Sequence, residues 1–393
     1  MSETRVAGAP ERVDVGAIER ELHRLWSSLD GEGAGGTAVA PVTRICTLTL
    51  LAVVREGRVA EAAAIAERLG ARYPSRSIVL DLTPGAGDRL AAEIALNCHA
   101  PGSPRPTVCC EQLIVSASGR SLARVPGLVL PLLVPDLPVY VWWSGDLPFA
   151  PLPAATNVEP ASSEPEADVL RRLAEVADVL IVDSSAMRRP AAGLRAAVAL
   201  AAPLSGGLRD LTWGRLTPWR DLVVQIFDPA PMRQALERLD RIRIRTEAGA
   251  DAGSAEPADP IAGLLLGGWM AGRLGWEPAG PARREGGVLR ALFWRDGGGL
   301  ELNVEGGAGP VLSIDCTAGG AEPCAVSLTR QSAGESSVRI ETRLGRGRPR
   351  TTAAGLALAD DAALIGAEFE VSGIDHVLRE ALEIVLRVTE GSS

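Results

Sequence analysis

The 393-residue chain contains no lysine, so all 40 of its basic residues are arginines. Acidic residues number 49, and the formal net charge is −9. A negative balance of this size argues against broad binding to nucleic acid or to a membrane surface, and we expect neither as a partner. Any site for an anion must be built from arginine side chains or backbone amides.

Long uninterrupted apolar segments are also missing. The longest apolar stretch, "VPGLVLPLLVPDLPVYVWW" (125–143), contains four prolines and Asp136, so it does not predict a membrane-spanning helix. The first residues, "MSETRVAGAPERVD", carry acidic side chains and lack the apolar core of a signal peptide. We therefore expect a cytoplasmic protein, whose six cysteines are thiols by default.

The usual catalytic signatures are absent from the sequence. There is no P-loop, no G-x-S-x-G and no H-E-x-x-H, and the cysteine spacing fits no zinc pattern. A G-x-G-x-x-G does occur at residues 31–36, but it lies between a predicted helix and a predicted strand. A dinucleotide site needs the opposite order, so a flexible loop is favoured. We expect no catalytic residue, no metal and no cofactor.

The first part of the chain alternates between helical and extended patterns. Residues 1–37 predict an amphipathic helix and a loop. Residues 38–246 begin with a buried strand, continue with a helix at 59–70 and return to a strand at 75–82. Strand, helix, strand predicts an α/β domain, which we expect to hold a mixed sheet with helices on both faces.

Two further segments of this domain, 91–98 and 107–118, predict strands joined as a hairpin. Cys109 and Cys110 are neighbours in the second strand and therefore point to opposite faces. Buried, unreactive thiols are favoured for both. The hairpin would bring Cys98 opposite one of them, which leaves a redox pair as the alternative.

The pattern changes after a linker at 247–259, which is rich in Gly, Ala, Ser and acidic residues. Residues 260–393 begin and end with helical sequence and predict a smaller α+β domain with an antiparallel meander sheet. Five alternating segments separated by glycine-rich turns predict its strands: 288–294, 300–304, 311–316, 324–330 and 337–344.

The remaining candidate residues are arginines and one aspartate at the end of a strand. The run "RIRIR" places Arg241 and Arg243 on one strand face, about 7 Å apart. With Arg76 they are weak candidates for anion binding, and solvated salt bridges are the alternative. "GRGRPR" (345–350) predicts an exposed turn, and Asp183 at the end of a strand is favoured as a helix cap over a ligand-binding residue.

Several segments resemble the glucose-6-phosphate dehydrogenase assembly protein family, OpcA. The segments are "VCCEQL" (108–113), the stretch 128–146 around "VYVWW", "DVLIVDSS" (178–185) and the stretch 208–228 with "LTWGRLTPWR". The resemblance implies a non-catalytic protein that assembles or activates glucose-6-phosphate dehydrogenase in the oxidative pentose phosphate pathway. It also implies thioredoxin control in photosynthetic members, but the last cysteine here is Cys324, so no switch is expected in the tail.

Tryptophans are the best candidates for contact with such a partner. The chain has eight Trp but only two Tyr and four Phe, and Trp142 and Trp143 are adjacent at a predicted strand end. If one indole enters the core, the other points to the opposite face, where it is either covered or free to touch a partner. The candidate contact residues are Trp142, Trp143, Asp146, Trp213, Arg215, Trp219 and Arg220. An enzyme or sensor that binds a sugar phosphate in the α/β domain is the alternative function.

Overall fold

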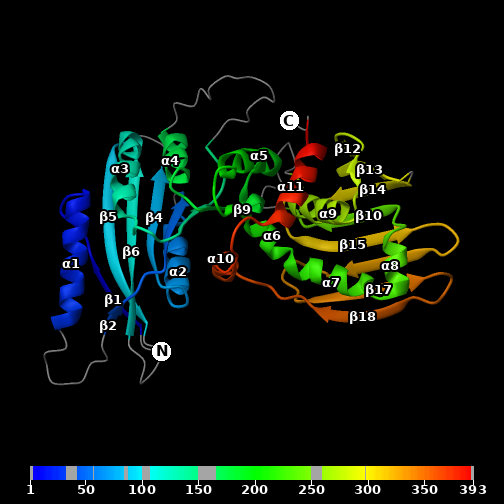
Figure 1. The fold of residues 1–393 in the computed structure, drawn as a ribbon, viewed down its shortest axis with the longest axis horizontal. Helices are drawn as coiled ribbons and strands as arrows, with labels where there is room; N and C mark the ends of the chain where they lie inside the picture. The colour runs from blue at the N-terminus through cyan, green and yellow to red at the C-terminus, as the bar shows by residue number, and fades with distance from the viewer. Residues whose placement is uncertain are drawn as a thin grey trace. The chain divides into compact units, whose positions relative to one another are not determined.

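A computed structural model describes residues 3–31, 42–55, 57–83, 87–99, 107–148, 165–248, 259–296 and 298–390. The described chain forms two nine-stranded sheets accompanied by helices (Figure 1), which confirms a mixed α/β protein. No described helix is long and apolar enough to cross a membrane. Two compact units are present: Met1–Val182 with Ala196–Arg209 and Asp360–Ile374, and Asp183–Arg195 with Asp210–Ala359 and Asp375–Ser393.

The first sheet has the strand order of a doubly wound nucleotide-binding fold. Counted from β3, the strands β6-β4-β3-β7-β8-β9 follow the order 3-2-1-4-5-6, and neighbouring strands from β6 to β8 are parallel. The bounds are β3 (Leu48–Val54), β4 (Ser75–Thr83), β6 (Thr107–Ser118), β7 (Val139–Trp143), β8 (Val179–Val182) and β9 (Gly207–Asp210). Antiparallel β5 (Arg89–His99) and β1 (Glu3–Gly8) extend one side, and β2 (Val42–Arg44) pairs with β6.

The central strands of this sheet are covered on both faces. Every residue of β3, β7 and β8 is buried. Because neighbouring side chains point to opposite faces, continuous burial requires cover on each side. The helices and 3₁₀ turns of this unit are α1 (Val15–Gly31), α2 (Val59–Gly70), η2 (Gly119–Arg124), α3 (Val125–Val129), η3 (Leu130–Leu132), α4 (Pro165–Ala174) and α10 (Asp361–Phe369).

In the second sheet, all five segments that the sequence predicts as strands are present. They are β13 (Val288–Arg295), β14 (Gly298–Glu305), β15 (Val311–Ala318), β16 (Cys324–Thr329) and β17 (Ser337–Leu344). The sheet is completed by β10 (Arg241–Thr246), β11 (Glu277–Pro278), β12 (Arg283–Glu285) and β18 (Arg350–Gly355). Its order is β11-β13-β14-β10-β15-β16-β17-β18, with β12 beside β13.

The predicted meander is interrupted, which corrects the sequence interpretation. Strand β10 lies between β14 and β15, parallel to the former and antiparallel to the latter. It precedes the predicted linker in sequence, yet it pairs with strands that follow the linker. The residues 241–246, which we expected in the first domain, therefore belong to the second sheet. Alternating Arg and Ile fit them to a strand with one buried face, but no local pattern says which sheet supplies the partners.

Helices pack on one face of the second sheet. Strand β10 buries Ile242 and Ile244 and exposes its arginines, and α9 (Ile261–Arg273) packs against β10 and β14. Gly263 permits this close approach, because a Cβ there would lie 2.4 Å from a methyl of Val304. The other helices and turns of this part of the chain are η4 (Ser184–Ala186), α5 (Pro190–Ala201), α6 (Leu211–Arg215), α7 (Thr217–Phe227), α8 (Ala230–Leu236) and α11 (His376–Val388).

Some sequence predictions fall where the structure gives no description. Residues 32–36 of the glycine motif and residues 249–258 of the linker lie outside the described residues. The two compact units are also discontinuous in sequence, whereas the sequence suggested contiguous segments. The strands β1 and β18 and the helix α10 carry no pattern that we recognised in the sequence.

The predicted hairpin of β5 and β6 is present, and its register decides the cysteine chemistry. Cys98 lies directly opposite Cys109, with 4.0 Å between their Cα atoms, and the two form a disulfide. This corrects the expectation that Cys109 is a thiol. Cys110 points to the other face and contacts Gly70. It stays a buried thiol as predicted, and burial raises the pKa of its sulfur.

We expect four thiols per chain to titrate when the protein is isolated without reductant and then denatured, and six after reduction. The disulfide closes a short loop, because the two cysteines have a sequence separation of 11. Removing this cross-link should lower the free energy of unfolding by about 3 kcal/mol, because the unfolded chain regains loop entropy. Denaturant titrations with and without dithiothreitol measure this. Six thiols titrating before reduction would contradict the disulfide.

Candidate functional site

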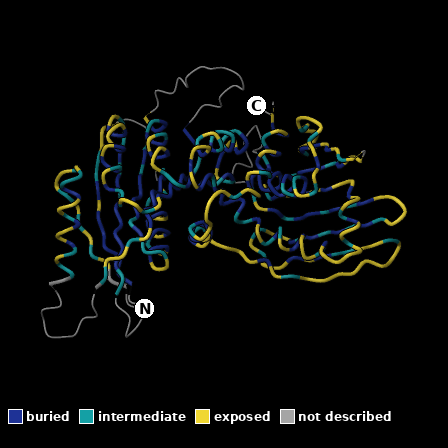
Figure 2. Tube along the Cα trace, in the orientation of Figure 1, coloured by how far each residue is buried: buried dark blue, intermediate teal, exposed yellow. Residues whose placement is uncertain are grey.

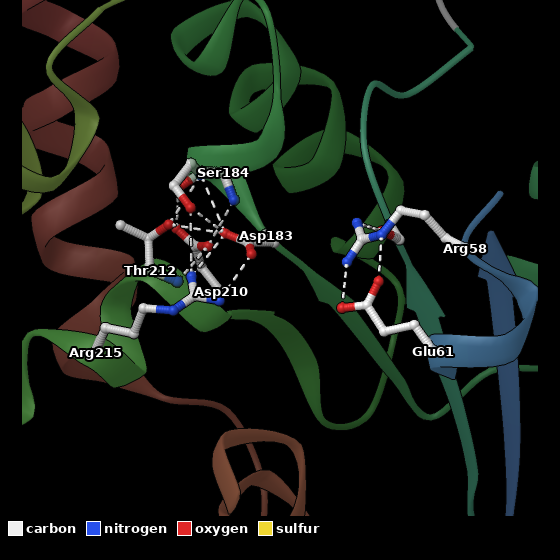
Figure 3. A network of polar contacts seen from close by, with 9 residues as sticks. Arg58, Glu61, Asp183, Ser184, Asp210, Thr212 and Arg215 are labelled. Carbon is white, nitrogen blue, oxygen red and sulfur yellow. Dashed lines mark hydrogen bonds and ion pairs between the residues drawn. The ribbon is translucent and has the colours of Figure 1, made fainter. Parts of the chain in front are cut away.

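The most extensive polar network described in the second unit surrounds two carboxylates (Figure 3). Asp183 directly follows β8, and Asp210 is the last residue of β9. Asp210 accepts hydrogen bonds from the backbone N–H of Ser184 at 2.9 Å and from its hydroxyl at 2.6 Å, and from the N–H of Thr212. Asp183 accepts from Ser185 and from the hydroxyl of Thr212.

Arg215 completes this network with a bidentate ion pair. Its Nη1 and Nη2 each donate to a different oxygen of Asp183, both at 2.9 Å. Asp183 also caps η4 through the N–H of Ser185, so the favoured cap interpretation is confirmed. Asp210 caps α6 in the same way through Thr212. Arg215, a candidate contact residue, is therefore held by an internal carboxylate with part of its side chain exposed.

The pKa values of Asp183 and Asp210 shift in opposite directions. Burial raises the pKa of Asp210 to about 6, the charge of Asp183 adds to the rise, and the hydrogen bonds from Ser184 and Thr212 oppose it. Burial would also raise the pKa of Asp183, but the hydrogen bonds and charge of Arg215 outweigh it and leave that pKa below its ordinary value. The paired arginine thus favours the ionised form of Asp183, whereas Asp210 stays protonated until the pH rises to about 6.

The geometry of this network suits a structural role better than catalysis. Ser184 is completely buried, and its hydroxyl is committed to Asp210. Asp210 is also completely buried. Among the described residues no group of three or more His, Cys, Asp or Glu is placed to hold a metal ion. The hydrogen bonds instead fix where η4 and α6 begin.

The tryptophan pair is buried on both faces of the first sheet. Trp142 is 2% exposed and Trp143 is 1% exposed. The indole N–H of Trp143 donates to the backbone carbonyl of Asp146 at 3.0 Å, which ties the turn after β7 to the core. Both indoles are therefore covered, which is the first of the two alternatives that the sequence left open. The reason is the central position of β7, which has covered neighbours on both sides.

The second tryptophan-rich segment is also structural in its contacts. Trp213 is buried, and its indole N–H donates to Asp375, which is the N-cap of α11. Arg220 stacks on the same indole, with its guanidinium carbon 3.6 Å from the ring centroid, and donates to the carbonyl of Trp213. Trp219 is buried beside Arg330. Of the predicted contact residues, the arginines and Asp146 keep partial exposure, and the indoles do not.

The predicted anion ligands all have carboxylate partners. Arg76 is largely buried and pairs with Glu111, with Nη2 and Oε2 2.6 Å apart, while its Nη1 donates to a backbone carbonyl. Arg241 and Arg243 extend from the exposed face of β10 to Glu301 and Glu305 of β14, at 3.8 Å and 3.2 Å. The alternative of solvated salt bridges therefore describes Arg241 and Arg243, whereas Arg76 forms a largely buried ion pair.

Sequence reasoning missed the polar contacts at the point where the strand order of the first sheet reverses. Ligands of doubly wound folds bind there, between the loops that leave β3 and β7. Arg58, just before α2, pairs with Glu61 and donates to the hydroxyl of Ser144, just after β7. Arg55 reaches the backbone carbonyl of Asp146. Arg55 and Arg58 follow the first strand of a strand–helix–strand unit, and this position in the sequence could have marked them as candidate site residues.

Most of the chain matches a known protein family, in two segments. Residues 66–199 match the family described as glucose-6-phosphate dehydrogenase subunit N-terminal domain, and residues 206–382 match the corresponding C-terminal domain. The chain belongs to the OpcA family. The resemblance found in the sequence is thereby confirmed.

The similar curated proteins come from cyanobacteria. A candidate OxPP cycle protein OpcA of Synechocystis sp. is 32% identical over 219 residues, which cover 56% of this chain and 41% of that protein. The protein of the same name in Nostoc punctiforme is 29% identical over 225 residues, covering 56% and 42%. The chain thus matches less than half the length of these relatives.

Two of the matching solved structures are dehydrogenases, at very low sequence identity and with TM-scores below 0.5. Apo levoglucosan dehydrogenase is 12% identical with a TM-score of 0.46, covering 88% of this chain and 96% of that one. The myo-inositol dehydrogenase of Lactobacillus casei, in complex with NAD(H) and myo-inositol, is 8% identical with a TM-score of 0.40, covering 88% and 93%. Likenesses this distant assign no activity.

Truncating either member of the buried tryptophan pair should destabilise the protein. We expect Trp142→Ala and Trp143→Ala each to lower the free energy of unfolding by about 3–5 kcal/mol, because each leaves a cavity in the core. Trp294→Ala is the matched control: that indole is 57% exposed, and its loss should cost no more than about 0.5 kcal/mol. Urea unfolding followed by far-ultraviolet circular dichroism gives the values. Wild-type stability in either core variant would refute the burial.

The raised pKa of Asp210 predicts a pH-dependent stability. The unfolded carboxyl titrates near 3.8 and the folded one near 6, so its contribution is complete below the first value and lost as pH rises through the second. This loss amounts to about 3 kcal/mol, at 1.36 kcal/mol per pKa unit. Asp183, whose pKa is lowered, loses its contribution only in more acidic solution, below its unfolded value.

Asp210→Asn replaces the carboxyl with a neutral amide of similar shape. The variant should therefore not lose stability as the pH rises through about 6. The stability of the variant relative to wild type should therefore rise between pH 4.5 and 7, by up to about 3 kcal/mol. Urea titrations of both proteins at several pH values measure the difference. A difference that stays constant with pH would show that Asp210 does not titrate in this range.

Proposed function

We propose that the protein is a non-catalytic assembly factor and allosteric activator of glucose-6-phosphate dehydrogenase, acting by direct protein contact in the oxidative pentose phosphate pathway. Membership of the OpcA family supports the dehydrogenase as its partner. The setting we propose is the cytoplasm, with no nucleic acid or membrane as a further partner. One structural observation carries the non-catalytic part: the arginine-containing turn between β3 and α2.

This turn occupies the position that binds the pyrophosphate in dinucleotide-binding folds. A dinucleotide site has a glycine-rich turn there, so that the backbone can approach the phosphates at the N-terminus of the following helix. Here the turn contains Gly57, at φ 87°, with Arg55 two positions before it and Arg58 directly after it. Arg58 precedes the helix and sends its side chain to Ser144, across the point where the strand order reverses.

These contacts support a fold retained without its nucleotide chemistry. Arg58 and Ser144 link the two loops that would flank a bound dinucleotide, and Arg58 is held further by Glu61. In the second unit, Ser184 and Asp210 are completely buried, and the hydroxyl of Ser184 donates to Asp210. The alternative, an enzyme or sensor for a sugar phosphate, gains no specific support, because Arg76, Arg241 and Arg243 are already paired with glutamates.

Mixing the purified protein with the glucose-6-phosphate dehydrogenase of its own organism tests the proposal. We expect a species of larger mass by light scattering and a faster reduction of NADP than with the dehydrogenase alone. The protein by itself, with glucose 6-phosphate and NADP, should show no reduction. The Trp142→Ala variant, which we expect to be destabilised, serves as a control for the need of a folded chain.

Two results would count against this function. Intrinsic reduction of NADP by the protein alone would show that it is an enzyme. A mixture with unchanged mass and unchanged rate would show that the dehydrogenase is not its partner.

A further inference from the structure

The hairpin of β17 and β18 ends the second sheet and is unusually exposed. Strand β18 pairs with β17 and has no second neighbour among the described strands. Five of its six residues are exposed and Ala354 is half-buried. In Figure 2 the outer edge of the second sheet, where Figure 1 places β18, is mostly coloured as exposed. Because successive side chains of a strand point to opposite faces, β18 is uncovered on both faces. An edge of this kind offers free backbone N–H and C=O groups to another chain.

The tip of the hairpin extends beyond the part of the sheet that is covered. In β17, Val338 and Ile340 are buried, but Thr342 and Leu344, which share their face, are half-buried and exposed. Leu344 is 38% exposed, an apolar side chain at the start of the turn. The turn itself, 345–349, is the segment that the sequence singled out as an exposed arginine-rich loop.

Four exposed arginines gather at this tip without an internal carboxylate. Arg343, Arg346, Arg348 and Arg350 lie within eight residues, and none of them has an ion pair with another described residue. The arginines of β10 show the contrast, since Arg241 and Arg243 both pair with glutamates. In a chain of net charge −9, the tip of this hairpin is a local concentration of positive charge, because Glu341, the one acidic residue of 337–355, pairs with Arg339.

We propose that the β17–β18 hairpin is a docking surface for an acidic segment of glucose-6-phosphate dehydrogenase. This inference rests on the proposed function and names the surface that performs it. Exposed guanidinium groups bind carboxylates with two parallel hydrogen bonds. The free edge of β18 adds backbone pairing with an extended segment, and Leu344 adds an apolar contact. The cationic tip selects an acidic partner and speeds its association.

The chemistry of the hairpin favours an acidic segment of another protein over a nucleic acid or a second copy of this chain. Residues 337–355 contain no aromatic side chain on which a base would stack, and the net charge of the whole chain opposes a polyanion. A second copy of the chain would bring an identical cationic hairpin, which disfavours pairing of this edge with itself.

Charge reversal at the tip tests the proposal. Arg346→Glu/Arg348→Glu changes two turn residues outside both strands, so the fold should persist, as circular dichroism and thermal unfolding will show. Binding to the dehydrogenase should weaken at least about 10-fold, because attraction is replaced by repulsion at two positions. Activation at a fixed, subsaturating concentration should fall accordingly. Added salt should weaken the wild-type complex more than that of the variant.

The matched control is Arg120→Glu/Arg124→Glu. These exposed arginines lie in the first unit, and their reversal gives the same change in net charge. It should leave affinity and activation at the wild-type level. An equal loss in both variants would overturn the proposal, because it would reflect net charge and not the hairpin.

The remaining outcomes separate this proposal from the proposed function. Wild-type affinity in the hairpin variant, with an intact fold, would overturn the docking surface and leave the function standing. Failure of the wild-type protein to bind the dehydrogenase would overturn both. Loss of self-association, or of binding to a single-stranded RNA probe, with dehydrogenase binding unchanged would assign the hairpin to a second copy or to nucleic acid and would overturn the proposal as well.

Discussion

Capping of helices by carboxylates is the interaction on which the second unit depends. The chain passes from the first unit to the second at Asp183, Asp210 and Asp375, and each of these aspartates caps the helix or turn that follows. A side-chain oxygen at this position satisfies backbone N–H groups that a helix start leaves unpaired. Arg215 neutralises the first carboxylate, Ser184 donates to the second, and Trp213 donates to the third.

This dependence accounts for the internal hydrogen bonds made by the family segments that contain several of the candidate contact residues. The "VDSS" and "RDLTWGR" segments supply the aspartates, the hydroxyls and the arginine of one connected set of hydrogen bonds. The second segment also supplies the indole that donates to Asp375. In the first unit, Glu111 of "VCCEQL" forms a largely buried ion pair with Arg76 of β4. Removing one partner of such a pair leaves a buried charge without compensation and is strongly destabilising.

The sequence predicts local structure well because strand and helix periodicities are local. Strand–helix–strand, the hairpin of β5 and β6 and the five strands after the linker follow from patterns within each segment. The placement of β10 does not, since pairing with β14 and β15 is a long-range choice. The burial of both Trp142 and Trp143 likewise depends on what covers each face of β7. The disulfide required the register that puts Cys98 opposite Cys109, which the sequence could offer only as an alternative.

Arginine has two different roles in this protein, one in the interior and one at the proposed contact surface. Paired arginines such as Arg76 and Arg215 hold carboxylates in the interior, whereas the arginines at the tip of β17 and β18 face solvent without described partners. Hydrogen–deuterium exchange tests this account most directly. Adding glucose-6-phosphate dehydrogenase should slow exchange in residues 337–355, and adding NADP alone should leave the turn 55–58 unchanged. Protection of that turn by NADP, with no change in the hairpin on adding the dehydrogenase, would contradict the account.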